Sequence, residues 1–224
     1  MQKPFELLVF DWDGTVMDSE AHIVASMERA IDDLRFPALP REAIRNVIGL
    51  GLFEAITSLY PSLAAGDVQA MTDRYRYHFL ADDPCEPFEG AEYVLRELSR
   101  QGYLMAVATG KGRRGLDRVL DSTGFLPLFH TTRCADETRS KPHPQMLEEI
   151  MDELGVEPSA TLMIGDTEYD LQMAQNAGTA SLAVSYGVHA PERLEQYKPL
   201  ACLDALLALP DWLESLGKRA VSGL

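Results

Sequence analysis

The sequence predicts an α/β fold in which a parallel sheet lies between two layers of helices and a helical domain is inserted near the start. Short, unbroken apolar runs alternate with segments of helical periodicity, as expected for strands that are buried on both faces. Between the first apolar run and the next, the segment from about 17 to 85 shows helical patterns and no strand pattern. This combination indicates a covered parallel sheet with one helical insertion.

The first strand is the apolar run ELLVF at 6–10, and a helix is expected from about 19 to 35. Two further helical patterns lie at 44–48, where glycines follow, and at 68–79. The segment 82–90, DDPCEPFEG, has the composition of a turn or linker. The apolar residues at helical spacing in this part of the chain are Ile23, Met27, Ile31, Leu34, Ile44, Val47, Ile48, Val68, Met71, Tyr75 and Phe79.

After Gly90 the strand and helix patterns alternate regularly. The expected strands are 103–109, a weak candidate at 131–135, 161–165 and 179–184. The expected helices are 91–98, 116–120, 143–154, 166–178 and segments within 203–216. We therefore expect a three-layer, Rossmann-like core formed by residues 1–16 and 86–224, and a separate helical domain formed by residues 17–85.

The composition narrows the classes of function. A hydrophobic content of 46% and a charged content of 25% are ordinary for a soluble globular protein. The formal charge of −15 disfavours binding of nucleic acid or of an anionic membrane over a broad surface. The three cysteines are odd in number and far apart, so neither a disulfide framework nor a zinc site is indicated. With no signal-peptide or membrane-span pattern, we expect a cytoplasmic protein. The sequence does not indicate an oligomeric state.

Polar residues follow several of the predicted strands. DWDGT at 11–15 follows the first, Thr109-Gly110-Lys111 follows the second, and Asp166 follows the strand at 161–165 with Asp170 four residues later. Lys141 stands in the segment SKPHP, just before a predicted helix. Because ligands of open parallel sheets bind at the carboxyl ends of the strands, these residues are expected to converge.

The chemistry of this set is coherent. Clustered carboxylates cannot all stay ionised without a cation, and oxygen ligands suit Mg²⁺. A carboxylate near Mg²⁺ can attack phosphorus as a nucleophile, and a second acid can protonate the leaving oxygen and later activate water. A threonine hydroxyl, a lysine ammonium and backbone N–H groups can hold the phosphoryl oxygens.

With the motifs DWDGT, ATGK, KPHP and GDTEYD in this order, the chain resembles the haloacid dehalogenase-like superfamily. The resemblance covers nearly the whole chain and is strongest to phosphoglycolate phosphatase-like members, which carry a helical cap after the first strand. It implies that residues 17–85 form this cap. It also implies that the chain is a phosphatase, a phosphoric monoester hydrolase, whose cofactor is Mg²⁺ and whose partner is a small phosphorylated metabolite.

The resemblance also assigns roles to single residues. Asp11 would be the nucleophile that forms an aspartyl-phosphate, and Asp13 would be the general acid and base. Thr109 and Lys141 would hold and neutralise the phosphoryl group. The expected metal site consists of Asp11, Asp13 (through its main-chain carbonyl), Asp166 and Asp170. The expected substrate-binding residues are Gly14, Thr15, Gly110, Lys111 and Arg45.

Several alternatives remain open at this point. A sugar-phosphate mutase would use the same aspartyl-phosphate but pass it to a sugar hydroxyl. A receiver domain or a regulatory binding protein would share the Asp, Thr, Lys and Mg²⁺. Lys111 and Arg45 could also be surface charges, and Asp170 could bind the metal directly or through water. The phosphate ester itself is not indicated by the sequence.

Overall fold

In the computed structural model, which describes residues 3–81 and 85–222, the predicted sheet is present and every pairing in it is parallel. Its strand order is β3-β2-β1-β4-β5-β6. Strands β2 and β3 lie on one side of β1, and strands β4, β5 and β6 lie on the other side. The direction in which strands are added therefore reverses between β1 and β4. Ligands of open α/β sheets bind at such a switch point. The strands are β1 (Leu7–Phe10), β2 (Leu104–Thr109), β3 (Thr131–Cys134), β4 (Thr161–Gly165), β5 (Ala180–Val184) and β6 (Cys202–Leu203).

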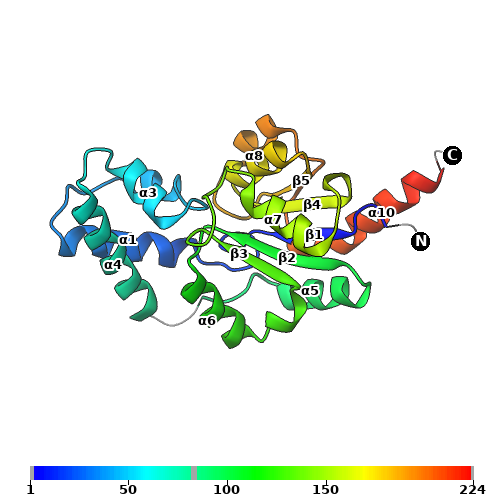
Figure 1. The fold of residues 1–224 in the computed structure, drawn as a ribbon, viewed down its shortest axis with the longest axis horizontal. Coiled ribbons are helices and arrows are strands. Elements are labelled where there is room, and N and C mark those ends of the chain that lie inside the picture. The colour runs from blue at the N-terminus through cyan, green and yellow to red at the C-terminus, as the bar shows by residue number, and fades with distance from the viewer. Residues whose placement is uncertain (1–2, 82–84, 223–224) are drawn as a thin grey trace.

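Helices cover both faces of this sheet, which confirms the predicted three-layer fold (Figure 1). Alternate residues of β1 point to opposite faces, as the pleat of a strand requires. Leu8 and Phe10 pack with α5 and α6, and Leu7 and Val9 pack with α7 and α8. The core helices are α5 (Ala91–Arg100), α6 (Arg113–Thr123), α7 (Gln145–Leu154), α8 (Glu168–Ala177), α9 (Pro191–Leu194) and α10 (Leu209–Ser222).

The segment between β1 and α5 is helical and lies to one side of the sheet (Figure 1). Its side chains form a hydrophobic cluster of their own, in which Met27, Ile44 and Met71 are buried. Val188 is buried in the same cluster although it comes from the loop after β5. The helices are α1 (Glu20–Asp33), α2 (Arg41–Arg45), α3 (Leu52–Leu59) and α4 (Ala65–Ala81).

The two connections to this helical segment run side by side. The amide of Asp18 donates to the carbonyl of Glu86 (3.0 Å), and the amide of Phe88 donates to the carbonyl of Val16 (2.9 Å). The first part of the predicted linker, 82–84, lies outside the described residues.

One element differs from the sequence-based expectation. The tail begins not with a helix at 203 but with the two-residue strand β6, whose residue Leu203 pairs with Val184. So short a strand has no periodicity of its own, and it forms because β5 offers it an unpaired edge.

Within residues 3–81 and 85–222, no helix has both the length and the hydropathy needed to cross a bilayer.

Candidate active site

The carboxyl ends of the two strands at the switch point each deliver an aspartate. Asp11 follows β1 and Asp166 follows β4, and the amide of Asp11 donates to the carbonyl of Ile164 (2.8 Å). Asp170 joins them from the first turn of α8. One carboxylate oxygen from each of these three acids lies within 4.8 Å of the others, and all three side chains are buried. The convergence expected from the sequence therefore exists in the fold.

Lys141 supplies the positive charge inside this cluster. It is fully buried, and its Nζ lies 2.7 Å from Oδ1 of Asp11 and 2.5 Å from Oδ1 of Asp170. Burial alone would lower the pKa of Lys141, but the charges and hydrogen bonds of the two carboxylates outweigh it and raise the pKa. The lysine is therefore held charged between the two acids.

Asp11 remains only partly neutralised. Burial and the charge of Asp170 raise its pKa well above the usual range, although the ammonium of Lys141 opposes the shift. Its Oδ2 is buried and accepts no hydrogen bond from the described residues. A buried carboxylate oxygen without a donor is costly, which marks it as a position for a ligand or a reacting atom.

Asp166 is fixed in one orientation by donors on both oxygens. Thr15 donates its hydroxyl to Oδ1 (2.8 Å), and Val188 donates its amide to Oδ2 (2.8 Å). Burial and the charge of Asp170 raise the pKa of Asp166 to about 7, against the opposing effect of these hydrogen bonds. Gly14, with φ +85°, passes so close to this carboxylate that a Cβ there would collide with it. A side chain at position 14 would therefore displace Asp166.

Asp170 is oriented by its own helix. Its Oδ2 accepts the hydroxyl of Thr167 (2.7 Å) and the amide of Thr167 (3.1 Å), which leaves Oδ1 for Lys141. Thr167 and Asp170 form a capping box at the start of α8. The hydrogen bonds that cap the helix therefore also orient the carboxylate of Asp170.

The cluster is matched to a divalent cation. Three buried carboxylates face a single ammonium, and the available oxygen atoms are the hard ligands that Mg²⁺ prefers. A divalent cation would balance the two negative charges that Lys141 leaves uncompensated.

A cavity of about 520 Å³ opens from Asp11 and Asp13 and extends between the sheet edge and the helices α1 to α4. Thr109, Gly110 and Lys111 line its core side. The hydroxyl of Thr109 is fully buried and accepts the amide of Lys111 (3.1 Å). The predicted residues after β1 and β2 thus share one cavity.

Comparisons with known proteins give matches over most of the chain. The sequence pattern described as haloacid dehalogenase-like hydrolase matches residues 8–184. The chain is 36% identical over 205 residues to "Probable phosphatase IndB" of Dickeya dadantii, covering 88% of this chain and 89% of that protein. It is 30% identical over 202 residues to "Pyrophosphatase PpaX" of Bacillus mycoides, covering 89% of this chain and 92% of that protein.

The chain belongs to the haloacid dehalogenase-like hydrolases. A solved hydrolase from Pseudomonas syringae shares the fold, with a TM-score of 0.83 and 20% identity over 95% of this chain and 99% of that one. The predicted family, the predicted fold and the predicted enzyme class, a phosphatase, are confirmed.

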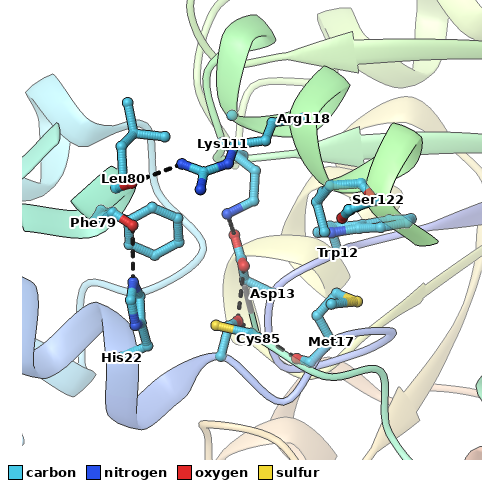
Figure 2. A pocket seen from close by; sticks show the side chains of 13 residues that line it. Trp12, Asp13, Met17, His22, Phe79, Leu80, Cys85, Lys111, Arg118 and Ser122 are labelled. Atoms are coloured by element: carbon cyan, nitrogen blue, oxygen red, sulfur yellow. Dashed lines mark hydrogen bonds and ion pairs between the residues drawn. The ribbon is translucent and has the colours of Figure 1, made fainter. Parts of the chain in front are cut away.

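In this haloacid dehalogenase-like site, Asp13 lies beside the acid cluster rather than within it. Its Oδ1 accepts the hydroxyl of Ser19 (2.7 Å), and its Oδ2 lies 2.9 Å from Nζ of Lys111. Figure 2 shows the lysine reaching down to this carboxylate past the ring of Phe79, whose centroid is 4.5 Å from Nζ. The carboxylate of Asp13 is thus held in place without contributing to the cluster of Asp11, Asp166 and Asp170.

Two predicted substrate-binding side chains have other partners. Thr15 is buried and donates to Asp166. Arg45 pairs with Glu20 (2.6 Å) and Glu42 (3.2 Å) and donates to the carbonyl of Val188 (3.2 Å), and it does not line the cavity. The guanidinium group of Arg45 is therefore engaged by other groups of the protein.

The loop between α2 and α3 contacts the residues that follow β2 and precede α7. The amide of Gly51 donates to Oγ of Ser140 (2.7 Å), next to Lys141. The carbonyls of Gly49 and Leu50 approach Gly110 so closely that a Cβ at position 110 would collide with them. The glycines at 49 and 51 therefore form a contact with the core, in addition to interrupting a helical pattern.

Sequence reasoning did not find Ser19, Val188 or Ser140. Serine is common on protein surfaces, so the sequence gives no reason to select Ser19 or Ser140. Val188 contributes its backbone amide, and the identity of a residue does not indicate how its backbone is used. The only available signal was proximity to a motif, since Ser19 follows DWDGT and Ser140 precedes Lys141.

Proposed function

We propose that this chain is a Mg²⁺-dependent phosphatase that hydrolyses a small phosphate monoester through an aspartyl-phosphate on Asp11. The observation that carries the proposal is the free Oδ2 of Asp11, which is buried at the inner end of the cavity beside the ammonium of Lys141. The phosphatase relatives support the reaction class.

In the first step, Oδ2 of Asp11 attacks phosphorus, and the bond from phosphorus to the leaving oxygen breaks. Asp13 donates its proton to that oxygen. In the second step, Asp13 takes a proton from a water molecule, whose oxygen attacks phosphorus. The bond to Asp11 then breaks, and inorganic phosphate and the free carboxylate result.

The remaining residues hold the reacting groups. Lys141 compensates the negative charge that builds up between Asp11 and the phosphoryl oxygens, and Thr109 offers its hydroxyl to one of those oxygens. Asp11, Asp166, Asp170 and the main-chain carbonyl of Asp13 would hold Mg²⁺. When bound, Mg²⁺ would supply positive charge that draws a phosphoryl oxygen toward Asp11.

We further propose that residues 17–85 act as a cap on a core formed by 1–16 and 86–224. The separate hydrophobic cluster of the helices and the two paired connections support this division. In this arrangement the contact from Gly51 to Ser140 belongs to the closed state and excludes water from Lys141. The cytoplasmic location remains a prediction from the sequence.

Phosphate release from a panel of small phosphate monoesters, with and without Mg²⁺, tests the proposal. Asp11→Asn should abolish release, whereas Asp18→Asn, an exposed acid on the same loop, should retain it. After rapid quenching, mass spectrometry should find one phosphoryl group on the peptide that contains Asp11. Release that continues without Mg²⁺ or in Asp11→Asn would refute the mechanism. Transfer of the phosphoryl group to a sugar hydroxyl instead of water would identify a mutase.

A further inference from the structure

The cavity is larger than a phosphoryl group requires. Its volume of about 520 Å³ falls in the range of sites that enclose a whole small-molecule ligand. The reacting carboxylates of Asp11 and Asp13 are buried and form only a small part of its lining. The leaving group of the substrate therefore has room to extend toward the mouth of the cavity.

The wall that faces this space from the helical segment is mostly apolar. Met27, Ile44 and Ile48 line it, together with the rings of Tyr75 and Phe79, which stack with centroids 5.6 Å apart. Such a wall favours a hydrocarbon or ring surface in the middle of the leaving group, because apolar area is removed from water there.

Two arginines from different helices line the same cavity. Arg76 comes from α4 and Arg114 from the first turn of α6. Both are exposed, and neither side chain has a hydrogen bond or ion pair with the described part of the chain. The two helices are in direct contact, because Arg118 of α6 donates to the carbonyl of Leu80 in α4 (2.8 Å). Arg76 lies one helical turn before Leu80, and Arg114 lies one helical turn before Arg118. The two guanidinium groups are thus carried by neighbouring faces of α4 and α6.

The acids near this mouth do not neutralise the arginines. Asp136 also lines the cavity, but its two oxygens accept the amide of Arg113 (2.9 and 3.2 Å). Glu54 lines it from the first turn of α3 without an ion pair to either arginine. The formal charge of the chain is −15, so carboxylates are abundant. Arg41, Arg96 and Arg133 each form an ion pair with a glutamate, whereas the two arginines at this cavity have no carboxylate partner among the described residues.

We propose that the substrate carries a second anionic group, a carboxylate or a phosphate, at the far end of an apolar leaving group, and that Arg76 and Arg114 bind it at the mouth of the cavity. Arginine suits this role because its planar guanidinium binds either anion with two parallel hydrogen bonds. This inference rests on the proposed phosphatase function and specifies its substrate class.

The test uses three substrates that differ only at the end remote from the phosphoryl group. These are an n-hexyl phosphate, the same chain ending in a carboxylate, and the same chain ending in a second phosphate. For the wild type with Mg²⁺, kcat/KM should be about tenfold or more higher for an anionic substrate than for the hexyl ester. The carboxylate and phosphate substrates show which of the two anions is preferred.

Arg76→Gln and Arg114→Gln should each lower this preference by roughly threefold, and the double variant should remove it. The matched control is Arg96→Gln, which removes an exposed helical arginine remote from the cavity and should leave the preference unchanged. Added salt should reduce the wild-type preference, because exposed charges are screened.

Equal kcat/KM values for the three substrates in the wild type would overturn the inference and leave the phosphatase function standing. A preference that persists in the double variant would do the same. If the folded wild type hydrolyses none of the three, and no other phosphate ester, the proposed function itself fails and the inference fails with it.

Discussion

Replacing Lys141 by methionine should reveal how strongly the acid cluster depends on this lysine. The side chain is fully buried, and its Nζ contacts Asp11 at 2.7 Å and Asp170 at 2.5 Å. Methionine keeps much of the hydrocarbon volume but removes the charge, so two buried carboxylates lose their shared cation. Removal of one partner of a buried ion pair typically costs about 3–5 kcal/mol, and we expect a loss of that size near pH 8 without divalent cations.

The loss should depend on pH in a defined direction. Lys141 has a raised pKa, so its own charge does not limit these ion pairs at any pH below its ordinary pKa. In Lys141→Met, the remaining charge can be relieved by protonation of Asp11, whose pKa is already raised. The cost should therefore shrink by about 1 kcal/mol or more when the pH is lowered from about 8 to about 5.

Urea unfolding in the presence of a chelator measures this cost. The matched control is Lys218→Met, which breaks an exposed pair with Glu214 on one helix face and should cost about 0.5 kcal/mol or less. Adding Asp170→Asn to Lys141→Met should recover part of the stability, because one uncompensated charge is removed. A cost below about 1 kcal/mol for Lys141→Met, or the same cost at both pH values, would refute the reasoning.

Three further expectations concern the same site. Asp11 has a raised pKa and Asp166 one of about 7, so the folded state keeps protons that the unfolded state has released. Without divalent cations, the free energy of unfolding should therefore fall by about 2–3 kcal/mol between about pH 5 and 8, as urea titrations would show, and Mg²⁺ should reduce the fall; a flat or rising profile would contradict it. Gly14→Ala should lower stability by about 1–2 kcal/mol through left-handed strain and should also abolish phosphate release, because the new Cβ displaces the carboxylate of Asp166; an active variant would show that this contact is unimportant. Ser140→Ala removes the acceptor for the amide of Gly51, so KM should rise about threefold to tenfold while thermal unfolding shifts little; an unchanged KM would exclude this contact from substrate binding.

The sequence was informative wherever a property depends on local pattern. Unbroken apolar runs predicted strands that are buried on both faces, and residues such as Leu8 and Val9 are indeed fully buried. The acids after the first strand and after 161–165 predicted the convergence of Asp11 and Asp166, because parallel strands present their carboxyl ends at one edge. Side-chain alternation and strand ends are local features, so one sequence suffices to predict them.

Local pattern was insufficient where a residue had a choice of partners. Arg45 and Arg114 are both arginines beside a glycine-containing loop, yet Arg45 binds Glu20 and Arg114 lines the cavity without a partner. Strand β6 is equally invisible in sequence, since its two residues are ordered by the edge of β5.

What the sequence determined by itself was the order of the strands and helices and the chemical types of the groups at the strand ends. Only the tertiary structure decided which of those groups meet. Val188 illustrates the difference, because its amide reaches Asp166 and its carbonyl reaches Arg45 across segments far apart in the chain. Such contacts depend on how distant segments pack, and the free energy that selects them belongs to the whole fold rather than to any stretch of residues.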